Sequence, residues 1–275
     1  MKIIKELPGA YSSKVELVEI DSQQYVLKTA DLEEISNEIF FNKTISDNGL
    51  PALKIIENTS LLKNQILMEY IEGSPELEKH RTVENYISWG EVTKKMHSII
   101  SPKPYKVNEE GRLVEVKWPE FIEEEIKAAV LRQQERNTNL DPRFIDEVVQ
   151  FIRPVVNIKH DSFSLVHSDL HSNNVLITER GSILFDKGSN IMYGDPLYDL
   201  AQTGISFQVG LNSEKENEET AKLLQAFITG YGMDFIKKDE KLFARYIALR
   251  ALRNHPNIFE PFLVALLKSI LIKYK

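Results

Sequence analysis

The feature that most constrains the fold of this chain is a short hairpin with polar residues at its open end. Residues 175–178 and 182–185 are strand-like runs with β-branched and aromatic side chains. Residues 179–181 between them have turn chemistry and end in a glycine. A hairpin folded there, with a loop of two or three residues, brings residue 186 back beside residue 174.

The residues at that open end carry oxygen atoms that can bind a cation. Asn174 and Asp186 would lie together, and Asp169 would reach the same place from the preceding loop. An amide oxygen and a carboxylate suit Mg²⁺, which proteins usually hold with one or two groups, water and substrate phosphates. Asp169, which the metal does not require, can accept the proton of an attacking hydroxyl. Either Asp169 or Asn174 alone more often caps a turn, but the whole arrangement favours a site of phosphoryl transfer.

Three motifs in this region resemble one family. Residues 167–174, HSDLHSNN, resemble the H-G-D-x-H-x-x-N catalytic loop of the aminoglycoside phosphotransferase and choline kinase superfamily. Phe185 and Asp186 resemble its metal-binding I-D-[FW] element, and residues 194–201, GDPLYDLA, resemble its G-D-P-x-x-D-L-A run. The resemblance implies that Asp169 is the catalytic base and that Asn174 and Asp186 are the magnesium ligands.

The resemblance also implies an α+β, bilobal, protein-kinase-like fold. We expect a nucleotide-binding lobe over residues 1–72, with a small antiparallel sheet and one helix. A larger, mainly helical lobe over residues 73–275 would carry the catalytic loop and the acceptor site. Asp199 would anchor the catalytic loop from this second lobe.

Two residues depart from the family pattern. Ser168 stands where glycine is usual, which is a modest restriction of the backbone. Lys187 follows the metal-binding aspartate, where we expect it to place a cation near the phosphates.

The first third of the chain contains the parts of a nucleotide lobe. Residues 14–20 and 24–29 are strand-like and are joined by a turn at 21–23. Lys28, near the end of the second strand, looks like the β3 lysine of kinase-like folds.

A helix is predicted over residues 31–46, with Asp31 as its N-cap. Glu38 falls at the edge of the apolar stripe of this helix, where it can face the sheet and pair with Lys28 to hold the α- and β-phosphates. The stripe consists of Leu32, Ile35, Ile39 and Ile45.

Two further segments are candidates for nucleotide contacts. Residues 7–15 occupy the place of the phosphate-covering loop and hold a single glycine, so Ser12 and Ser13 would supply the phosphate contacts. Residues 65–73 resemble the hinge between lobes. Met68 would be the gatekeeper there, and backbone groups of Glu69 and Ile71 would bind adenine; a plain core strand with a polar exit explains the same pattern equally well.

Beyond residue 80 the pattern becomes helical. Residues 82–100 carry apolar side chains at helical spacing, and residues 105–116 contain a hairpin tip that we expect to shape the acceptor entrance. Further helices are predicted at 141–156, 195–208, 214–231, 238–254 and 259–273.

Composition excludes several classes of protein. The net charge is −7 and no basic cluster is interleaved with aromatic residues, which argues against a nucleic-acid partner. The longest apolar stretch, residues 262–272, is interrupted by Lys268 and is too short to span a bilayer, so we expect no membrane partner. The absence of cysteine and of a signal peptide agrees with a cytoplasmic protein. The oligomeric state is left open.

The sequence therefore predicts a kinase that uses ATP or GTP with Mg²⁺ to phosphorylate a hydroxyl of a small molecule. An aminoglycoside-type antibiotic is the first expectation for the acceptor, and choline, an amino sugar or methylthioribose is nearly as well supported. Two other classes remain open. One is a pseudokinase that binds nucleotide without turnover. The other is a metallohydrolase built on His167, Asp169 and His171, which share one face of an extended segment.

Overall fold

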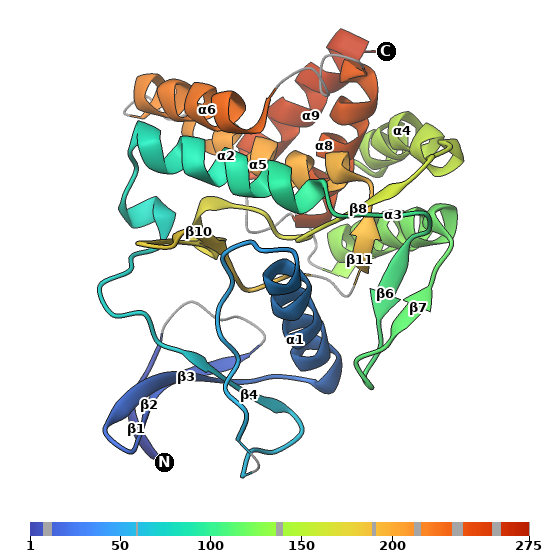
Figure 1. The fold of residues 1–275 in the computed structure, drawn as a ribbon. Coiled ribbons are helices and arrows are strands. Elements are labelled where there is room, and N and C mark those ends of the chain that lie inside the picture. Colours follow the sequence, from blue (N-terminus) through green and yellow to red (C-terminus); the bar gives the residue numbers. More distant parts are fainter. Residues whose placement is uncertain are drawn as a thin grey trace.

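The protein combines an N-terminal antiparallel sheet with a larger helical part (Figure 1). This architecture is the predicted one. The structure is a computed structural model, and it describes residues 1–7, 13–58, 60–135, 140–188, 191–211, 216–232, 239–254 and 260–274.

The N-terminal sheet has four strands in the order β1-β2-β3-β4, namely β1 (Lys2–Glu6), β2 (Lys14–Ile20), β3 (Gln23–Thr29) and β4 (Gln65–Glu69). Asp21 and Ser22 form the turn between β2 and β3, with φ values of 50° and 63°. Two successive residues with positive φ match the twist of a tight hairpin. The connection is therefore one residue shorter than the predicted turn at 21–23, because Gln23 already pairs with Ile20.

Helix α1 (Leu32–Asp47) lies between this sheet and the helical part (Figure 1). Its N-cap is Asp31, as predicted, and the Asp31 side chain accepts a hydrogen bond of 2.7 Å from the Glu34 N–H. The predicted apolar stripe is partly wrong, because Leu32 and Ile39 are exposed. The buried face of α1 includes three polar residues. Its buried residues are Ile35, Asn37, Glu38, Phe41, Asn42 and Ile45.

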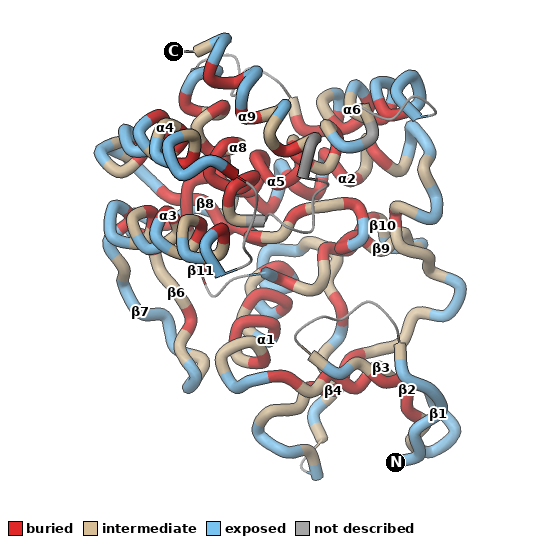
Figure 2. Tube along the Cα trace, turned by 180° about the vertical axis from the view of Figure 1, so that it is seen from behind, coloured by how far each residue is buried: buried red, intermediate tan, exposed pale blue. Residues whose placement is uncertain are grey.

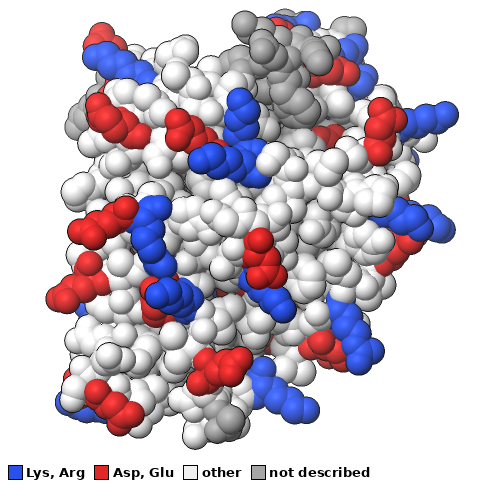
Figure 3. Space-filling model, in the orientation of Figure 1, with Lys and Arg blue, Asp and Glu red and all other residues white. Residues whose placement is uncertain are grey.

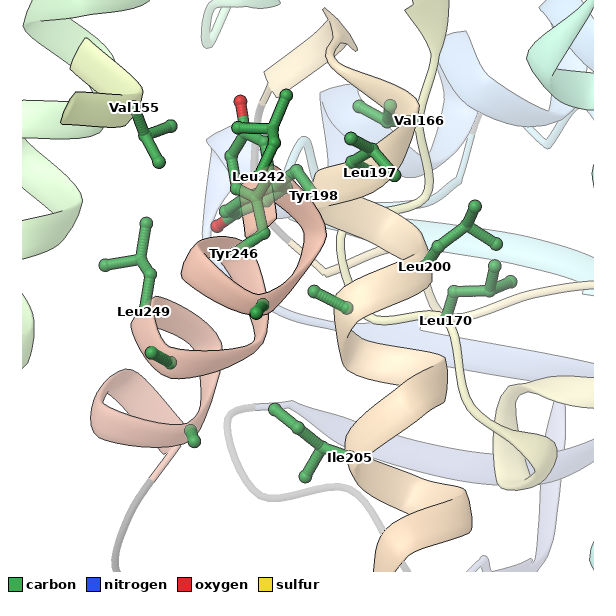
Figure 4. Close-up of a cluster of buried hydrophobic side chains, with 14 of the residues drawn as sticks. Val155, Val166, Leu170, Leu197, Tyr198, Leu200, Ile205, Leu242, Tyr246 and Leu249 are labelled. Atoms are coloured by element: carbon green, nitrogen blue, oxygen red, sulfur yellow. The ribbon is translucent and has the colours of Figure 1, made fainter. Parts of the chain in front are cut away.

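The helical part is built from α2 (Val83–His97), α3 (Trp118–Glu135), α4 (Pro142–Ile152), α5 (Pro196–Leu211), α6 (Asn217–Tyr231), α8 (Glu240–Asn254) and α9 (Glu260–Tyr274). Helices α5 and α8 run through its buried centre, whereas α3, α4 and α6 turn their exposed faces outward (Figure 2). Figure 4 shows α5 and α8 side by side, with Leu200 of α5 next to Leu170 of the loop at residues 167–174 and Leu249 of α8 pointing toward Val155. This packing holds the catalytic loop against the core.

Short strands and 3₁₀ turns complete the fold. A five-stranded sheet, in the order β5-β8-β11-β6-β7, contains β5 (Ile100–Ser101), β6 (Tyr105–Val107), β7 (Leu113–Glu115), β8 (Phe163–Leu165) and β11 (Ile191–Gly194). Gly111, at φ 72°, closes the β6–β7 hairpin at its predicted tip. The 3₁₀ turns are η1 (Leu77–Lys79), η2 (Arg153–Asn157) and η3 (Ser172–Asn174).

The hairpin that opened the sequence analysis is formed by β9 (Val175–Thr178) and β10 (Gly181–Leu184). Gly181 pairs with Thr178, so the loop has two residues, and φ at Gly181 is 102°. Leu184 pairs with Val175, which returns the chain to residues 174 and 186 as predicted.

Acidic and basic side chains are interspersed over the face seen in Figure 3. Among the described residues, the helices are all too short or too polar to cross a membrane.

Candidate active site

The open end of the β9–β10 hairpin brings three predicted site residues together. The Asn174 side-chain nitrogen donates to the backbone oxygen of Asp169 at 2.9 Å and to its carboxylate Oδ2 at 3.2 Å. It also lies 3.5 Å from the backbone oxygen of Asp186. The nitrogen of the Asn174 amide makes these contacts, so the amide oxygen is not used in them. The arrangement depends on the hairpin register, since the Phe185 N–H donates to the Asn174 carbonyl at 3.1 Å.

Asp169 is an ionised carboxylate in the loop at residues 167–174. Burial alone raises its pKa, but a hydrogen bond from His171 and the positive charges of His171 and Arg250 lower the pKa of Asp169 to about 2. The His171 Nε2 atom lies 3.3 Å from Asp169 Oδ2. The Asp169 side chain is 38% exposed, so its charged carboxylate is accessible from solvent.

Lys28 links the sheet to the hairpin. Its ammonium group lies 2.7 Å from Asp186 Oδ1, 3.0 Å from Glu34 Oε1 and 3.5 Å from Glu38 Oε2. Burial lowers the pKa of Lys28, but the carboxylates of Glu38, Asp186 and Glu34 outweigh burial and raise the pKa above its ordinary value. The structure thus places Lys28 beside Glu38 and also beside the predicted metal ligand Asp186.

The buried side chain of Asp199 binds the backbone of the catalytic loop, at the place that the resemblance implies. Its two oxygens accept hydrogen bonds of 2.5 Å each from the N–H groups of His167 and Ser168. His97 Nε2 lies 3.3 Å from the same carboxylate, and His97 Nδ1 lies 2.9 Å from the Tyr231 hydroxyl oxygen. Ser168 has a φ of 70°, which costs a residue with a side chain about 1–3 kcal/mol.

Gly188 is a site residue that the sequence analysis missed. A Cβ atom at this position would lie 2.7 Å from the Asp169 Cβ, and the Gly188 N–H donates to the His167 carbonyl at 3.0 Å. The two loops therefore touch through their backbones, which requires a glycine next to Asp169. A glycine close to the predicted site residue Asp186 was the signal available in the sequence.

Lys187 does not point toward the nucleotide side as expected. Its ammonium group is buried and donates to the Ile191 carbonyl at 2.6 Å. Burial lowers the pKa of Lys187 to about 7, although the negative charges of Asp199 and Glu38 raise this pKa in part. The expectation of a cation near the phosphates is wrong, because the amine turns into the protein along β11.

The Lys187→Met variant should unfold at a higher temperature at pH 6, with a smaller gain at pH 9. The folded pKa lies below the unfolded value of about 10.4, so the folded protein binds fewer protons between about pH 7 and 10. The contribution of Lys187 to the free energy of unfolding therefore becomes less unfavourable as the pH rises through that window. Below about pH 7 the cost of burying the charged ammonium group is fully present, and the substitution removes that cost. We expect a gain on the order of 1 kcal/mol at pH 6. A gain independent of pH in thermal melts would contradict this prediction.

The His167 side chain is not placed as a metal ligand. Its ring is buried, and its Nε2 atom lies 2.9 Å from the Phe185 carbonyl. Burial lowers the pKa of His167, so the neutral ring donates this hydrogen bond. In the part of the chain that the structure describes, no group of three or more His, Cys, Asp or Glu residues is arranged to hold a metal ion. The metallohydrolase hypothesis is therefore not supported.

The predicted nucleotide-contact residues lie in and after β4 and before β2. Met68 is buried in an apolar cluster with Ile66 and Ile183, between the sheet and the hairpin. The Glu69 N–H donates to the Lys54 carbonyl at 2.9 Å, so this N–H is already occupied. Ile71 lies at the edge of the same cluster. Ser13 precedes β2, and Ser12 lies outside the described residues.

Two apolar residues that the sequence analysis missed lie at this cluster. Val26 of β3 and Leu176 of β9 both pack against it. Both residues belong to apolar runs of predicted strands, but no sequence pattern marks them out from their neighbours. Together they add apolar surface of the kind that lines small-molecule pockets.

A cavity of about 290 Å³ adjoins the catalytic loop at Ser172. Its floor includes the aromatic rings of Tyr86, Trp89 and Phe207. The cavity also contains the carboxylates Glu78 and Glu216, both of which pair with Arg81. The residues that line it do not include the predicted entrance at 105–116.

Solved structures show the class of fold. The chain resembles a thermostable mutant of aminoglycoside phosphotransferase APH(4)-Ia, with a TM-score of 0.68 at 14% identity, over 98% of this chain and 94% of that one. It resembles spectinomycin phosphotransferase APH(9)-Ia, crystallised with ADP and spectinomycin, with a TM-score of 0.59 at 18% identity, over 98% and 91% of the two chains. It also resembles Plasmodium vivax ethanolamine kinase, with a TM-score of 0.57 at 14% identity, over 97% and 81%. The fold is thus that of protein-kinase-like phosphotransferases.

The sequence itself identifies the family. Residues 3–243 match the profile of the phosphotransferase enzyme family, and the chain belongs to this family. No curated protein sequence matches the chain.

Proposed function

We propose that the protein is an ATP- and Mg²⁺-dependent kinase that transfers the γ-phosphate to a hydroxyl of a small molecule. The observation that carries this proposal is the convergence of Asp169, Asn174, Asp186 and Lys28 at the open end of one hairpin. The division into a nucleotide lobe (1–72) and an acceptor lobe (73–275) belongs to the same proposal.

The donor atoms at this place suit a magnesium ion. The Asn174 amide oxygen and the half-exposed Asp186 carboxylate are hard oxygen ligands, and both lie where phosphates would enter. When bound, the ion supplies positive charge that stabilises the transferring phosphoryl group.

The protein groups supply positioning and charge. Asp169, ionised and partly exposed, orients the acceptor hydroxyl and takes its proton. Lys28 is held by Glu38 and binds the α- and β-phosphates of the nucleotide. To do so, its ammonium group leaves Asp186 and contacts the phosphates instead. Adenine lies against Val26 and Leu176, near the Glu69 carbonyl and the Ile71 N–H.

The acceptor in this proposal is an aminoglycoside-type antibiotic. Solved relatives of the fold include phosphotransferases for such compounds, and the carboxylates Glu78 and Glu216 in the cavity beside Ser172 suit a ligand that carries amino groups. Ethanolamine kinase shares the fold, so a metabolite alcohol with an amino group is the second candidate.

The test is a screen for nucleotide consumption with Mg²⁺, using ATP and GTP in parallel. Aminoglycosides, macrolides, choline, ethanolamine and sugar alcohols are supplied one at a time, and products are identified by mass spectrometry. We expect one class to gain a single phosphate. Nucleotide binding in a thermal-shift assay without transfer to any of these compounds would favour the pseudokinase instead.

A further inference from the structure

A buried arginine beyond the segment that matches the family reaches the catalytic loop. Arg250 lies on α8, and the matching segment ends at residue 243. One of its terminal nitrogens donates to the Ser168 carbonyl at 2.5 Å, and the other donates to the Tyr198 hydroxyl at 2.8 Å. The guanidinium carbon lies 4.7 Å from the centre of the Tyr198 ring. Arg250 is therefore fixed by Tyr198 and contacts the peptide group that precedes Asp169.

Ser168 is in a conformation that needs external support. Its φ of 70° is one that residues with a Cβ atom disfavour. Its N–H is held by Asp199, and its carbonyl is held by Arg250. Its hydroxyl oxygen is buried and makes no hydrogen bond with the described residues. The backbone contacts to α5 and α8, rather than the serine side chain, therefore maintain this conformation.

We propose that Arg250 is a positioning residue that keeps Asp169 aimed at the acceptor hydroxyl by holding the Ser168 carbonyl. This inference rests on the proposed function, which makes Asp169 the base. A glycine at position 168 would adopt the same φ without strain. If the contact with Asp199 or with Arg250 is lost, Ser168 returns to a negative φ. The peptide group that joins Ser168 to Asp169 rotates with this change.

The experiment compares Arg250→Gln in the wild type and in a Ser168→Gly background. In the wild type, we expect Arg250→Gln to lower kcat about 10- to 100-fold, with KM for ATP little changed, because misplacement of the base affects the chemical step. In the Ser168→Gly background, the same substitution should lower kcat by a factor of about three or less, because glycine does not relax. Equal factors in the two backgrounds, or an unchanged kcat in Arg250→Gln, would overturn the proposal.

Arg245→Gln is the matched control. Arg245 lies on the same helix, donates to the Phe151 carbonyl at 3.1 Å and lies 5.6 Å from the Phe151 ring. It makes the same kinds of contact as Arg250 but away from the catalytic loop, so its kcat should stay at the wild-type value. A loss in this variant equal to that of Arg250→Gln would show a general effect on α8 and would overturn the proposal.

A second measurement needs no acceptor. A crystal structure of Arg250→Gln should show Ser168 at negative φ, with the Asp169 carboxylate displaced from the Asn174 side-chain nitrogen. An unchanged Ser168 would overturn the proposal even if phosphotransfer is confirmed. If the wild type transfers no phosphate to any compound in the screen, the proposed function fails, whereas this structural result still decides whether Arg250 holds the loop.

Discussion

Asp169→Asn should lower turnover about 100-fold or more while nucleotide binding is preserved. The amide keeps the shape of the side chain but cannot accept the proton of the acceptor hydroxyl. Nucleotide affinity should persist because Lys28 pairs with Glu34, Glu38 and Asp186, and none of these contacts involves Asp169. Steady-state kinetics with the acceptor found by screening, together with ADP titrations, measure both quantities.

Asp146→Asn is a suitable control for this change. Asp146 is exposed on α4, so the same substitution there should leave turnover and stability unchanged. Wild-type turnover in Asp169→Asn would refute the assignment of Asp169 as the base and would leave positioning by the rest of the site as the source of catalysis.

Asp186→Asn should abolish the magnesium dependence of nucleotide binding and lower turnover about 100- to 1,000-fold. The substitution removes the carboxylate that lies 2.7 Å from Lys28 and that we assign to the metal. The fold should persist, because Glu34 and Glu38 still pair with the buried Lys28 ammonium group.

Isothermal titration of ATP, with Mg²⁺ and then with EDTA, tests this second prediction. The wild type should bind more tightly with Mg²⁺, and Asp186→Asn should show equal affinities in the two conditions. A variant that keeps the full effect of Mg²⁺ would show that Asp186 is not a metal ligand. Asp146→Asn again serves as the control for the loss of one carboxylate.

The parts of the site that local chain geometry determines were predictable. The β9–β10 register follows from two apolar runs and a glycine turn, so the meeting of Asn174 with Asp186 follows as well. The N-cap at Asp31 follows from side-chain chemistry. In both cases the interacting groups are separated by few residues, and the backbone leaves few alternatives.

Other features depend on contacts that no local pattern encodes. Strand β1 is exposed along its whole length, so it has no alternating pattern, and the five-stranded sheet is made of runs of two to four residues. The buried face of α1 includes Asn42, whose side chain donates to Glu38 and accepts from the Leu53 N–H. Polar residues that are satisfied in this way cannot be distinguished from exposed ones by hydropathy.

The burial of Lys187 and the role of Arg250 were not predicted for a related reason. Lys187 and Arg250 look like surface residues in sequence, because lysine and arginine are rarely enclosed. Lys187 donates to Ile191, four positions away, but Arg250 donates to Ser168, 82 positions away. Their roles became visible only once the helices were in place.

The β6–β7 hairpin has a consequence for how the molecule moves. The Ser36 hydroxyl of α1 donates to the Glu109 carbonyl at the hairpin tip, at 2.9 Å. This hydrogen bond joins α1, the helix that carries Glu38, to the β6–β7 hairpin of the helical part. The contact is separate from the chain connection at residues 65–73. A movement of α1 relative to the helical part would therefore either break this hydrogen bond or displace the β6–β7 hairpin as well.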